Sequence, residues 1–510
     1  MKISKLSVFL CFFSLWVIAC SCSSPIEPEP KADQNFYSYT VKLPSLHPDS
    51  FSMVMKINDF PGFDGQLILP GHYYDNPLDS FSATTAEDIV ITDSLGNNVQ
   101  DTLMFTQNIG PLQSTIISLP STAKFPITVR YRVDASVIHR QEEFMPTFRF
   151  DNDALFLMGA HFFIIPLISE DLAVLWRSHQ KIQVKTQIGS GVQSFGLPEQ
   201  SSYRNLYELL FIQITAGGDL LWSGGSNNQH YFVVDILDDN ADKSYLNYVD
   251  TIARQLIGLS DHIQGIFGNL RTQGDAYTVV FSDMNGGLEG YNGFTMIAPY
   301  EGFIPILSSL IAHEIVHHYI GIRCGDLDDP WWKEGVTTYL GYLFAARLGY
   351  YSNWDCRYHL LEHKRDYSDS KYAVTFSDPQ LRENLFPSGA WPIVYERGSR
   401  ISLIMDYRVR NATANGVKFE DIMAQLVRDN DGSGFSRGQF IDAFENHGVD
   451  VSDLFELYVD RVSTEISDSD IHLAFEYLES LGEMGHNQSI IASDTPLSKP
   501  RSSYEHFLKW

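Results

Sequence analysis

Short runs of alternating hydrophobic and polar residues fill the chain between residue 36 and about residue 222. Clear examples lie at 38–43, 66–69 and 127–133, and Pro, Gly, Asn and Asp separate the runs. A period of two residues places one side of each run in a core and the other toward solvent, as in half-buried strands. The pattern predicts a β-sandwich-like domain over residues 36–225.

The pattern changes near residue 225. An apolar strand is expected at 231–237, longer helical periods follow at 245–259 and 304–320, and residues 352–481 are mostly helical. We therefore expect a multidomain α+β protein. After the β-sandwich-like domain it would have a mixed α/β lobe at 226–350, a helical carboxy-terminal lobe at 351–485 and a tail at 486–510.

The helix expected at 304–320 contains the run His313-Glu314-Ile315-Val316-His317. Positions four apart on a helix differ by about 40°, so both imidazoles point the same way and can share one tetrahedral metal. Glu314 lies beside them, placed to act as the general base on a zinc-activated water rather than as a ligand. The run is typical of a zinc site. His318 points elsewhere and is expected at the surface or behind the ligands.

A catalytic zinc needs a third protein ligand and an open fourth position. Glu334 follows in the first turns of a second helix, which Pro330 can begin after the loop at 325–330. The loop carboxylates Asp326, Asp328 and Asp329 are expected to be solvated. We predict one Zn²⁺ per chain, bound by His313, His317 and Glu334. Thr338 or a backbone carbonyl is expected to orient a ligand imidazole.

Further segments resemble the glycyl aminopeptidase family of thermolysin-like zinc metallopeptidases, which are gluzincins related to the aminopeptidase N family. Together with the predicted ligands, these segments span about half the chain in the family's order. They are Gly286-Gly287-Leu288-Glu289, Val394-Tyr395-Glu396-Arg397-Gly398 and the following run at 403–410.

The resemblance implies a thermolysin-like catalytic domain with a mixed lobe and a helical lobe. It also implies that Glu289, with Gly286 and Gly287, lies at the substrate edge and captures a peptide's free amine. Tyr395 would stabilise the oxyanion.

The chain departs from this family at several places. Gly290 stands where the family has His, and residues 318–323 replace the family's Trp-Asn-x-Lys-Arg stretch. A preference for amino-terminal glycine is therefore not carried over. The PDZ domain that ends many members is expected to be absent.

These residues predict an extracytoplasmic zinc-dependent metallopeptidase that acts on peptide or protein substrates, most simply an aminopeptidase. A zinc endopeptidase with the same site is one alternative. A surface binding lipoprotein that has lost catalysis on a peptidase scaffold is another, but binding alone would not require the general base Glu314.

The amino terminus predicts export and a lipid anchor. Lys2 and Lys5 precede a short apolar stretch at 6–18, which is typical of a signal peptide covering residues 1–19. Val17-Ile18-Ala19-Cys20 resembles a bacterial lipobox, so Cys20 would be lipidated and residues 20–35 would form a Pro-rich tether. The enzyme would then lie in the bacterial cell envelope, anchored to a membrane. A secreted form without the lipid is the alternative.

Composition supports an exported globular protein. The formal net charge of −27 excludes nucleic acid as a partner, because a polyanion would be repelled. Cys324 and Cys356 either pair in an oxidising compartment or remain buried thiols. The run 429–434 begins like a calcium loop, but Phe440 occupies the position of the required Glu. We expect a turn there and no calcium.

Overall fold

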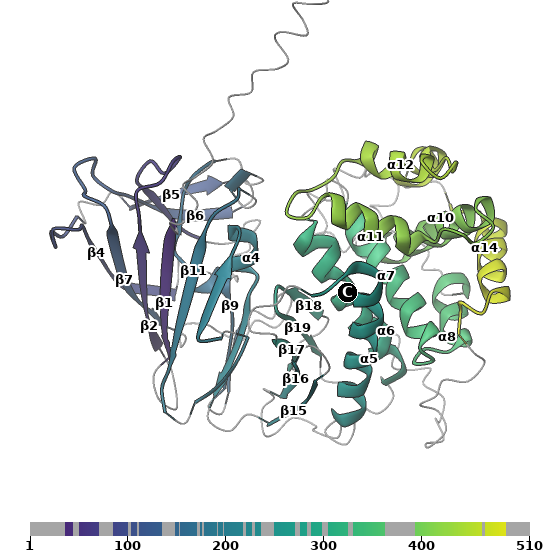
Figure 1. Cartoon of the computed structure of the whole chain (residues 1–510), viewed down its shortest axis with the longest axis horizontal. Coiled ribbons are helices and arrows are strands. Elements are labelled where there is room, and N and C mark those ends of the chain that lie inside the picture. The colour runs from purple at the N-terminus through teal and green to yellow at the C-terminus, as the bar shows by residue number, and fades with distance from the viewer. Residues whose placement is uncertain are drawn as a thin grey trace, which may run out of the picture.

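The computed structural model describes residues 36–43, 50–70, 85–99, 104–109, 112–134, 148–151, 154–170, 174–175, 178–190, 192–196, 198–217, 221–226, 230–235, 249–270, 276–282, 287–297, 304–324, 330–362, 393–461 and 465–485. The predicted signal peptide, the tether with Cys20, Gly286, the loop aspartates and the tail at 486–510 lie outside these residues. Figure 1 shows a β-rich domain on one side, a small sheet in the middle and a helical lobe on the other side.

A six-stranded sheet forms one part of the β-rich domain. Its order is β13-β11-β1-β2-β7-β4, with β1 parallel to β11 and the other pairs antiparallel. Side chains alternate between buried and exposed along β1 and β7, as the sequence pattern predicts. The strands are β1 (Tyr37–Leu43), β2 (Ser50–Ile57), β4 (Ala86–Thr92), β7 (Ile127–Asp134), β11 (Ile182–Ile188) and β13 (Gln200–Tyr203).

Two four-stranded sheets complete this domain, and one hydrophobic core joins all three sheets. The first, in the order β10-β3-β6-β5, contains β3 (Gln66–Leu69), β5 (Met104–Ile109), β6 (Leu112–Ser118) and β10 (Ile165–Pro166). The second, in the order β12-β14-β9-β8, contains β8 (Phe148–Asp151), β9 (Ala154–Met158), β12 (Gln193–Phe195) and β14 (Gln213–Gly217). The short helices η1 (Gly159–His161) and α4 (Leu206–Leu210) connect these strands.

The mixed lobe is built on a five-stranded sheet with the order β15-β16-β17-β19-β18. β15 precedes the expected domain boundary at residue 225, yet it pairs with β16 in this sheet. The strands are β15 (Leu221–Ser226), β16 (His230–Asp235), β17 (Ala276–Ser282), β18 (Gly287–Gly290) and β19 (Gly293–Ile297). The helices are α5 (Val249–Phe267), α6 (Ile304–His317), η5 (His318–Arg323) and α7 (Pro330–Arg347).

The remaining helices form the carboxy-terminal lobe, and a second core runs through it from the mixed sheet and α5 to α14. This arrangement confirms the predicted fold class. The helical segments are α8 (Asn353–Arg357), η6 (Tyr358–Glu362), η7 (Ile393–Arg397), α10 (Gly398–Ala412), α11 (Phe419–Asp429), α12 (Arg437–Glu445), α13 (Ser452–Leu454), η8 (Phe455–Val459) and α14 (Asp468–Ser480). None of the helices in the described part of the chain combines the length and the apolar character that crossing a membrane requires.

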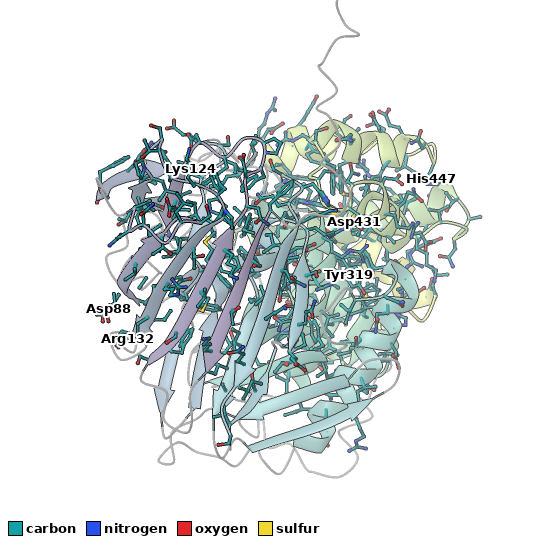
Figure 2. All side chains as sticks on the ribbon, turned by 60° about the vertical axis from the view of Figure 1, so that its left-hand side comes forward. Asp88, Lys124, Arg132, Tyr319, Asp431 and His447 are labelled. Atoms are coloured by element: carbon teal, nitrogen blue, oxygen red, sulfur yellow. The ribbon has the colours of Figure 1, made fainter. Side chains whose placement is uncertain are left out.

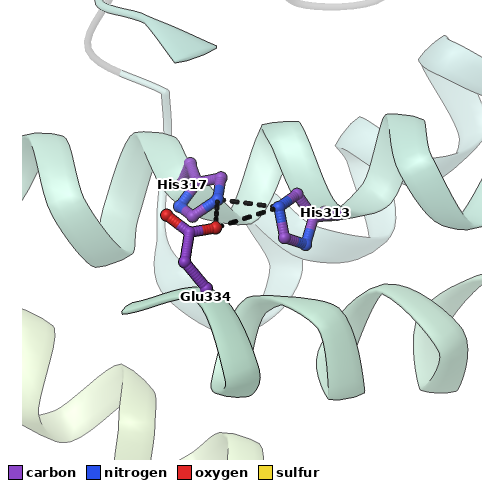
Figure 3. Close-up of side chains that lie close together, drawn as sticks. All are labelled: His313, His317 and Glu334. Carbon is purple, nitrogen blue, oxygen red and sulfur yellow. Dashed lines mark hydrogen bonds and ion pairs between the residues drawn. The ribbon is translucent and has the colours of Figure 1, made fainter. Parts of the chain in front are cut away.

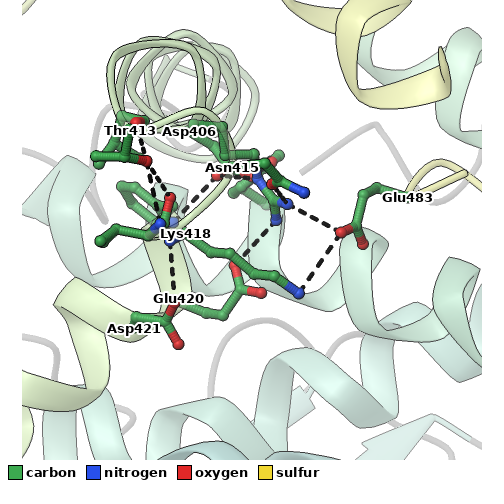
Figure 4. Close-up of polar contacts among 12 residues, drawn as sticks. Asp406, Thr413, Asn415, Lys418, Glu420, Asp421 and Glu483 are labelled. Atoms are coloured by element: carbon green, nitrogen blue, oxygen red, sulfur yellow. Dashed lines mark hydrogen bonds and ion pairs between the residues drawn. The ribbon is translucent and has the colours of Figure 1, made fainter. Parts of the chain in front are cut away.

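A buried polar network ties α7 to α10 and α11 (Figure 4). The Arg410 guanidinium is fully buried, and its Nε donates to Oδ1 of Asp406 at 2.6 Å. Oδ2 of Asp406 accepts from the Tyr339 hydroxyl at 2.5 Å, and Glu420 and Glu483 also pair with Arg410. Buried charges persist only when they are paired in this way. The network therefore holds α7, the helix that carries Glu334, in register with α10.

The helical lobe and the β-rich domain meet at Asp431, in the loop after α11 (Figure 2). Its carboxylate lies 3.2 Å from Nη2 of Arg323, which ends η5, and 3.5 Å from Nη2 of Arg204, which follows β13. Phe440 is buried in α12, where a calcium loop would need an exposed carboxylate. Asp431 therefore serves a contact between domains.

Candidate active site

The two histidines of the expected zinc motif lie on one side of α6. His313 and His317 are buried, and their Nε2 atoms are 2.8 Å apart. α6 ends at His317, whereas the sequence pattern predicted a helix to residue 320. The backbone leaves the helical region at Ile320 (φ −100°, ψ 100°) and Gly321 (φ 123°, ψ −62°). Glycine adopts this positive φ without a Cβ clash, so the helix can turn sharply just after the second histidine.

Glu334 reaches the histidines from the second turn of α7 (Figure 3). Its Oε2 lies 3.2 Å from Nε2 of His317 and 3.6 Å from Nε2 of His313. In the part of the chain that the structure describes, these three residues are the group of potential metal ligands. The structure thus brings together the three residues that the sequence nominated from two separate helices.

The separations fit a tetrahedral zinc ion. Ligand atoms at 2.0–2.1 Å from such an ion lie about 3.3 Å from one another, close to the three measured distances. Burial opposes ionisation of Glu334, but the adjacent His317 charge and hydrogen bonds from both histidines hold its pKa well below the ordinary value. One carboxylate with two imidazoles is also a donor set that zinc favours.

Each ligand imidazole has a partner at its other nitrogen. Thr338 Oγ1 donates to the Glu334 carbonyl at 2.7 Å and lies 3.3 Å from Nδ1 of His313, from which it can accept. Nδ1 of His317 lies 3.2 Å from the Ile320 carbonyl, which can only accept. Both contacts favour a proton on Nδ1 and leave the Nε2 lone pairs facing Glu334. The sequence named Thr338 or a carbonyl for this role, and the structure uses one for each histidine.

Two further nominated residues lie at this site. Glu314 is buried on α6 between the two ligand histidines. Tyr395 is partly buried in η7, and its ring stacks on the His313 imidazole at a centroid distance of 5.8 Å and an interplanar angle of 21°. A segment some 80 residues beyond α6 is therefore brought against the first histidine.

The substrate-edge motif forms β18, the last strand of the mixed sheet. Gly287 and Glu289 lie in this strand, which pairs only with β19 and packs beside α6. The register places Glu289 opposite Phe294. An edge strand has one set of backbone groups available to another extended chain. The fold therefore presents this motif next to the zinc helix.

Several residues of the site carried no clear signal in the sequence. His318 is fully buried against the rings of Tyr277 and Tyr291, so its expected place at the surface is wrong. A Cβ on Gly335 would lie 2.4 Å from Cα of Gly398, where α7 crosses α10. Cys324 and Cys356 are buried as separate thiols, which resolves the alternative left open above. Only close approach in three dimensions reveals these roles.

Comparison with known proteins places the fold. No protein-family model matches this chain. No curated protein matches it either.

Solved structures do share its architecture. An aminopeptidase N family protein from Idiomarina loihiensis aligns with a TM-score of 0.62 and 15% identity, covering 86% of this chain and 78% of that one. An M1 zinc metallopeptidase from Deinococcus radiodurans, bound to a Tyr-Ser-Ala substrate, aligns at 0.53 and 14%, covering 85% and 95%. Legionella pneumophila aminopeptidase A aligns at 0.52 and 14%, covering 84% and 50%. The chain therefore has the fold of the aminopeptidase N family of M1 zinc metallopeptidases.

Proposed function

We propose that this protein is a zinc-dependent aminopeptidase of the cell envelope. The observation that carries the proposal is the convergence of His313, His317 and Glu334 at zinc-like separations, with Tyr395 stacked on His313. The fold shared with zinc metallopeptidases supports it.

The proposed chemistry is hydrolysis of a peptide bond. When bound, zinc would supply a Lewis acid that polarises the scissile carbonyl and acidifies water. The Glu314 carboxylate takes the proton of the attacking water and passes it to the leaving amine. The Tyr395 phenol donates a hydrogen bond to the developing oxyanion. Thr338 and the Ile320 carbonyl keep the ligand imidazoles in the required tautomer.

Amino-terminal specificity is proposed to come from β18. There Glu289 captures the free ammonium group, and the backbone of Gly286 and Gly287 borders the substrate. The segments shared with glycyl aminopeptidases support this assignment, while Gly290 in place of the family's histidine speaks against transferring their side-chain preference. An endopeptidase with the same zinc site would not need this amine contact.

Membrane attachment through Cys20 is part of the proposal and rests on the amino-terminal sequence. A Cys20→Ser chain expressed in a bacterial host should no longer incorporate labelled fatty acid, whereas the parent should. Labelling of both chains to the same extent would remove the anchor from the proposal.

Metal content and hydrolysis of the parent and of Glu314→Gln test the function. We expect about one zinc per chain in both proteins and hydrolysis of free-amine peptides by the parent alone. An acetylated peptide should resist cleavage, and its equal cleavage would favour the endopeptidase. Zinc without turnover on any peptide would favour a binding protein, and failure to bind zinc would refute the proposal.

A further inference from the structure

The tip of the β18–β19 hairpin is attached to the β-rich domain. Gly290 pairs with Gly293, which leaves Tyr291 and Asn292 as the turn. The Tyr291 amide donates to the Phe211 carbonyl at 2.8 Å, just before β14 of the β-rich domain. The strand that carries Glu289 is thus linked to a domain that otherwise contributes none of the site residues described above.

The Asn292 side chain makes the strongest part of this attachment. Its Oδ1 accepts from the Gln213 amide at 2.8 Å, and its Nδ2 donates to the carbonyls of Gln213 at 3.0 Å and Gly196 at 2.6 Å. The residue is only 1% exposed. One side-chain amide therefore satisfies both backbone groups of Gln213, as a neighbouring strand would.

The backbone of Asn292 connects the same point to the centre of the mixed sheet. Its carbonyl accepts from the Thr278 amide in β17 at 3.0 Å. Tyr291 packs on Tyr203 of the β-rich domain and on His318, the residue after the zinc motif, with ring centroids 5.8 Å apart in both pairs. The hairpin tip is consequently held on both sides of the domain junction.

Gly290 is a consequence of this attachment. A Cβ at this position would lie 2.6 Å from Cγ and Cδ of Gln213, whose side chain is buried. A larger residue would push the hairpin away from β14 or displace Gln213. Glycine therefore permits the contact at the position where the resemblance leads one to expect histidine.

We propose that Asn292 is a positioning residue for substrate binding, which sets the place of β18 and Glu289 beside α6 by holding the hairpin on the β-rich domain. The inference rests on the proposed function, in which Glu289 captures the substrate amine. The β-rich domain is then part of the specificity apparatus, although it supplies no group that touches the substrate.

Steady-state kinetics of Asn292→Ala test this. We expect KM for a free-amine tripeptide to rise about tenfold, with zinc content and kcat close to those of the parent, because the hairpin moves and the zinc ligands do not. Asn353→Ala is the matched control: Asn353 is also buried, and its Nδ2 lies 3.4 Å from the Met484 carbonyl in the helical lobe. Its KM should not change. An unchanged KM in Asn292→Ala, or an equal rise in the control, would overturn the inference.

A rescue experiment separates positioning from general destabilisation. Gly290→Ala should raise KM, and adding Gln213→Ala should restore it, because the second change removes the carbons that the new methyl group meets. The backbone bonds of Gln213 to Asn292 are retained in the double variant. A double variant with the KM of Gly290→Ala would contradict the proposal.

Hydrogen exchange covers the case in which the parent cleaves no peptide, which would refute the proposed function alone. Amides of residues 287–297 should exchange faster in Asn292→Ala than in the parent, while those of α6 should not. Equal exchange of residues 287–297 in the two proteins would overturn the inference independently of any activity.

Discussion

Replacing Gly335 with Ala should disrupt the zinc site without touching a ligand. Gly335 follows Glu334 on α7, where the helix crosses α10 at Gly398. The added Cβ would lie 2.4 Å from Cα of Gly398 and 2.9 Å from the Val394 carbonyl. These are backbone atoms, so no side-chain rotation relieves the clash. Because carbon atoms settle at about 3.5 Å, the two helices would have to separate by roughly 1 Å.

The surroundings of α7 leave little room for that shift. On the side facing α6, a Cβ on Gly341 would already lie 2.7 Å from the Ser309 carbonyl, so α7 is closely packed there too. Zinc ligand distances vary by only about 0.2 Å among good sites, several times less than the shift required. We expect zinc affinity to fall by about 10–100-fold, and the zinc-free protein to lose about 1–3 kcal/mol of stability from overpacking.

Competition with a chelator measures the zinc affinity, and urea unfolding of the zinc-free protein measures the stability. Gly265→Ala provides the control, because Gly265 lies in α5 and an added Cβ there meets no atom within 4 Å. This control should bind zinc as the parent does and be no less stable. If Gly335→Ala kept the parent's zinc affinity, the close crossing of α7 and α10 would not determine the position of Glu334.

Three further predictions concern other parts of the molecule. Thr338→Val should lower zinc affinity about tenfold in a chelator competition, while Thr338→Ser should retain it, because only the hydroxyl contacts His313. Burial lowers the pKa of His161 from 6.5 to about 3, so the unfolded chain takes up a proton that the folded chain refuses as pH falls below 6.5. Stability should therefore drop by about 2 kcal/mol between pH 7 and pH 5, and the unfolding free energy of His161→Gln should lack this part of the pH dependence. Asp406→Asn should cost about 3–5 kcal/mol in urea unfolding because it leaves the buried Arg410 charge without its nearest partner, whereas Asp453→Asn, at a largely exposed pair with Arg408, should cost less than about 1 kcal/mol.

Much of the zinc site could be predicted from the sequence because its main signal is local. The four-residue spacing of His313 and His317 on an apolar helix places both rings on one side whatever surrounds the helix. The alternating pattern of β1 and β7 likewise depends on strand geometry alone. The nomination of Glu334, Tyr395 and Glu289 needed the order of motifs shared with a known family, because no local rule connects them to the histidines.

The end of α6 shows where local reasoning fails. Residues 318–320 continue the apolar pattern, so periodicity extended the helix through them. In the structure Gly321 turns the chain, His318 enters the domain junction and the Ile320 carbonyl returns to His317. A glycine alone does not announce a turn, because isolated glycines occur within helices as well.

The sequence by itself thus determined the β-rich and helical parts of this protein, the pair of zinc histidines and the general base between them. These follow from the periods of strands and helices, which involve neighbours a few residues apart. Only the tertiary structure decided that Glu334 completes the ligand set, that Gly335 and Gly398 let α7 and α10 touch, and that Asn292 joins the substrate strand to the β-rich domain. Each of these depends on backbones from distant segments approaching within a few ångströms, a distance that packing of the whole chain sets.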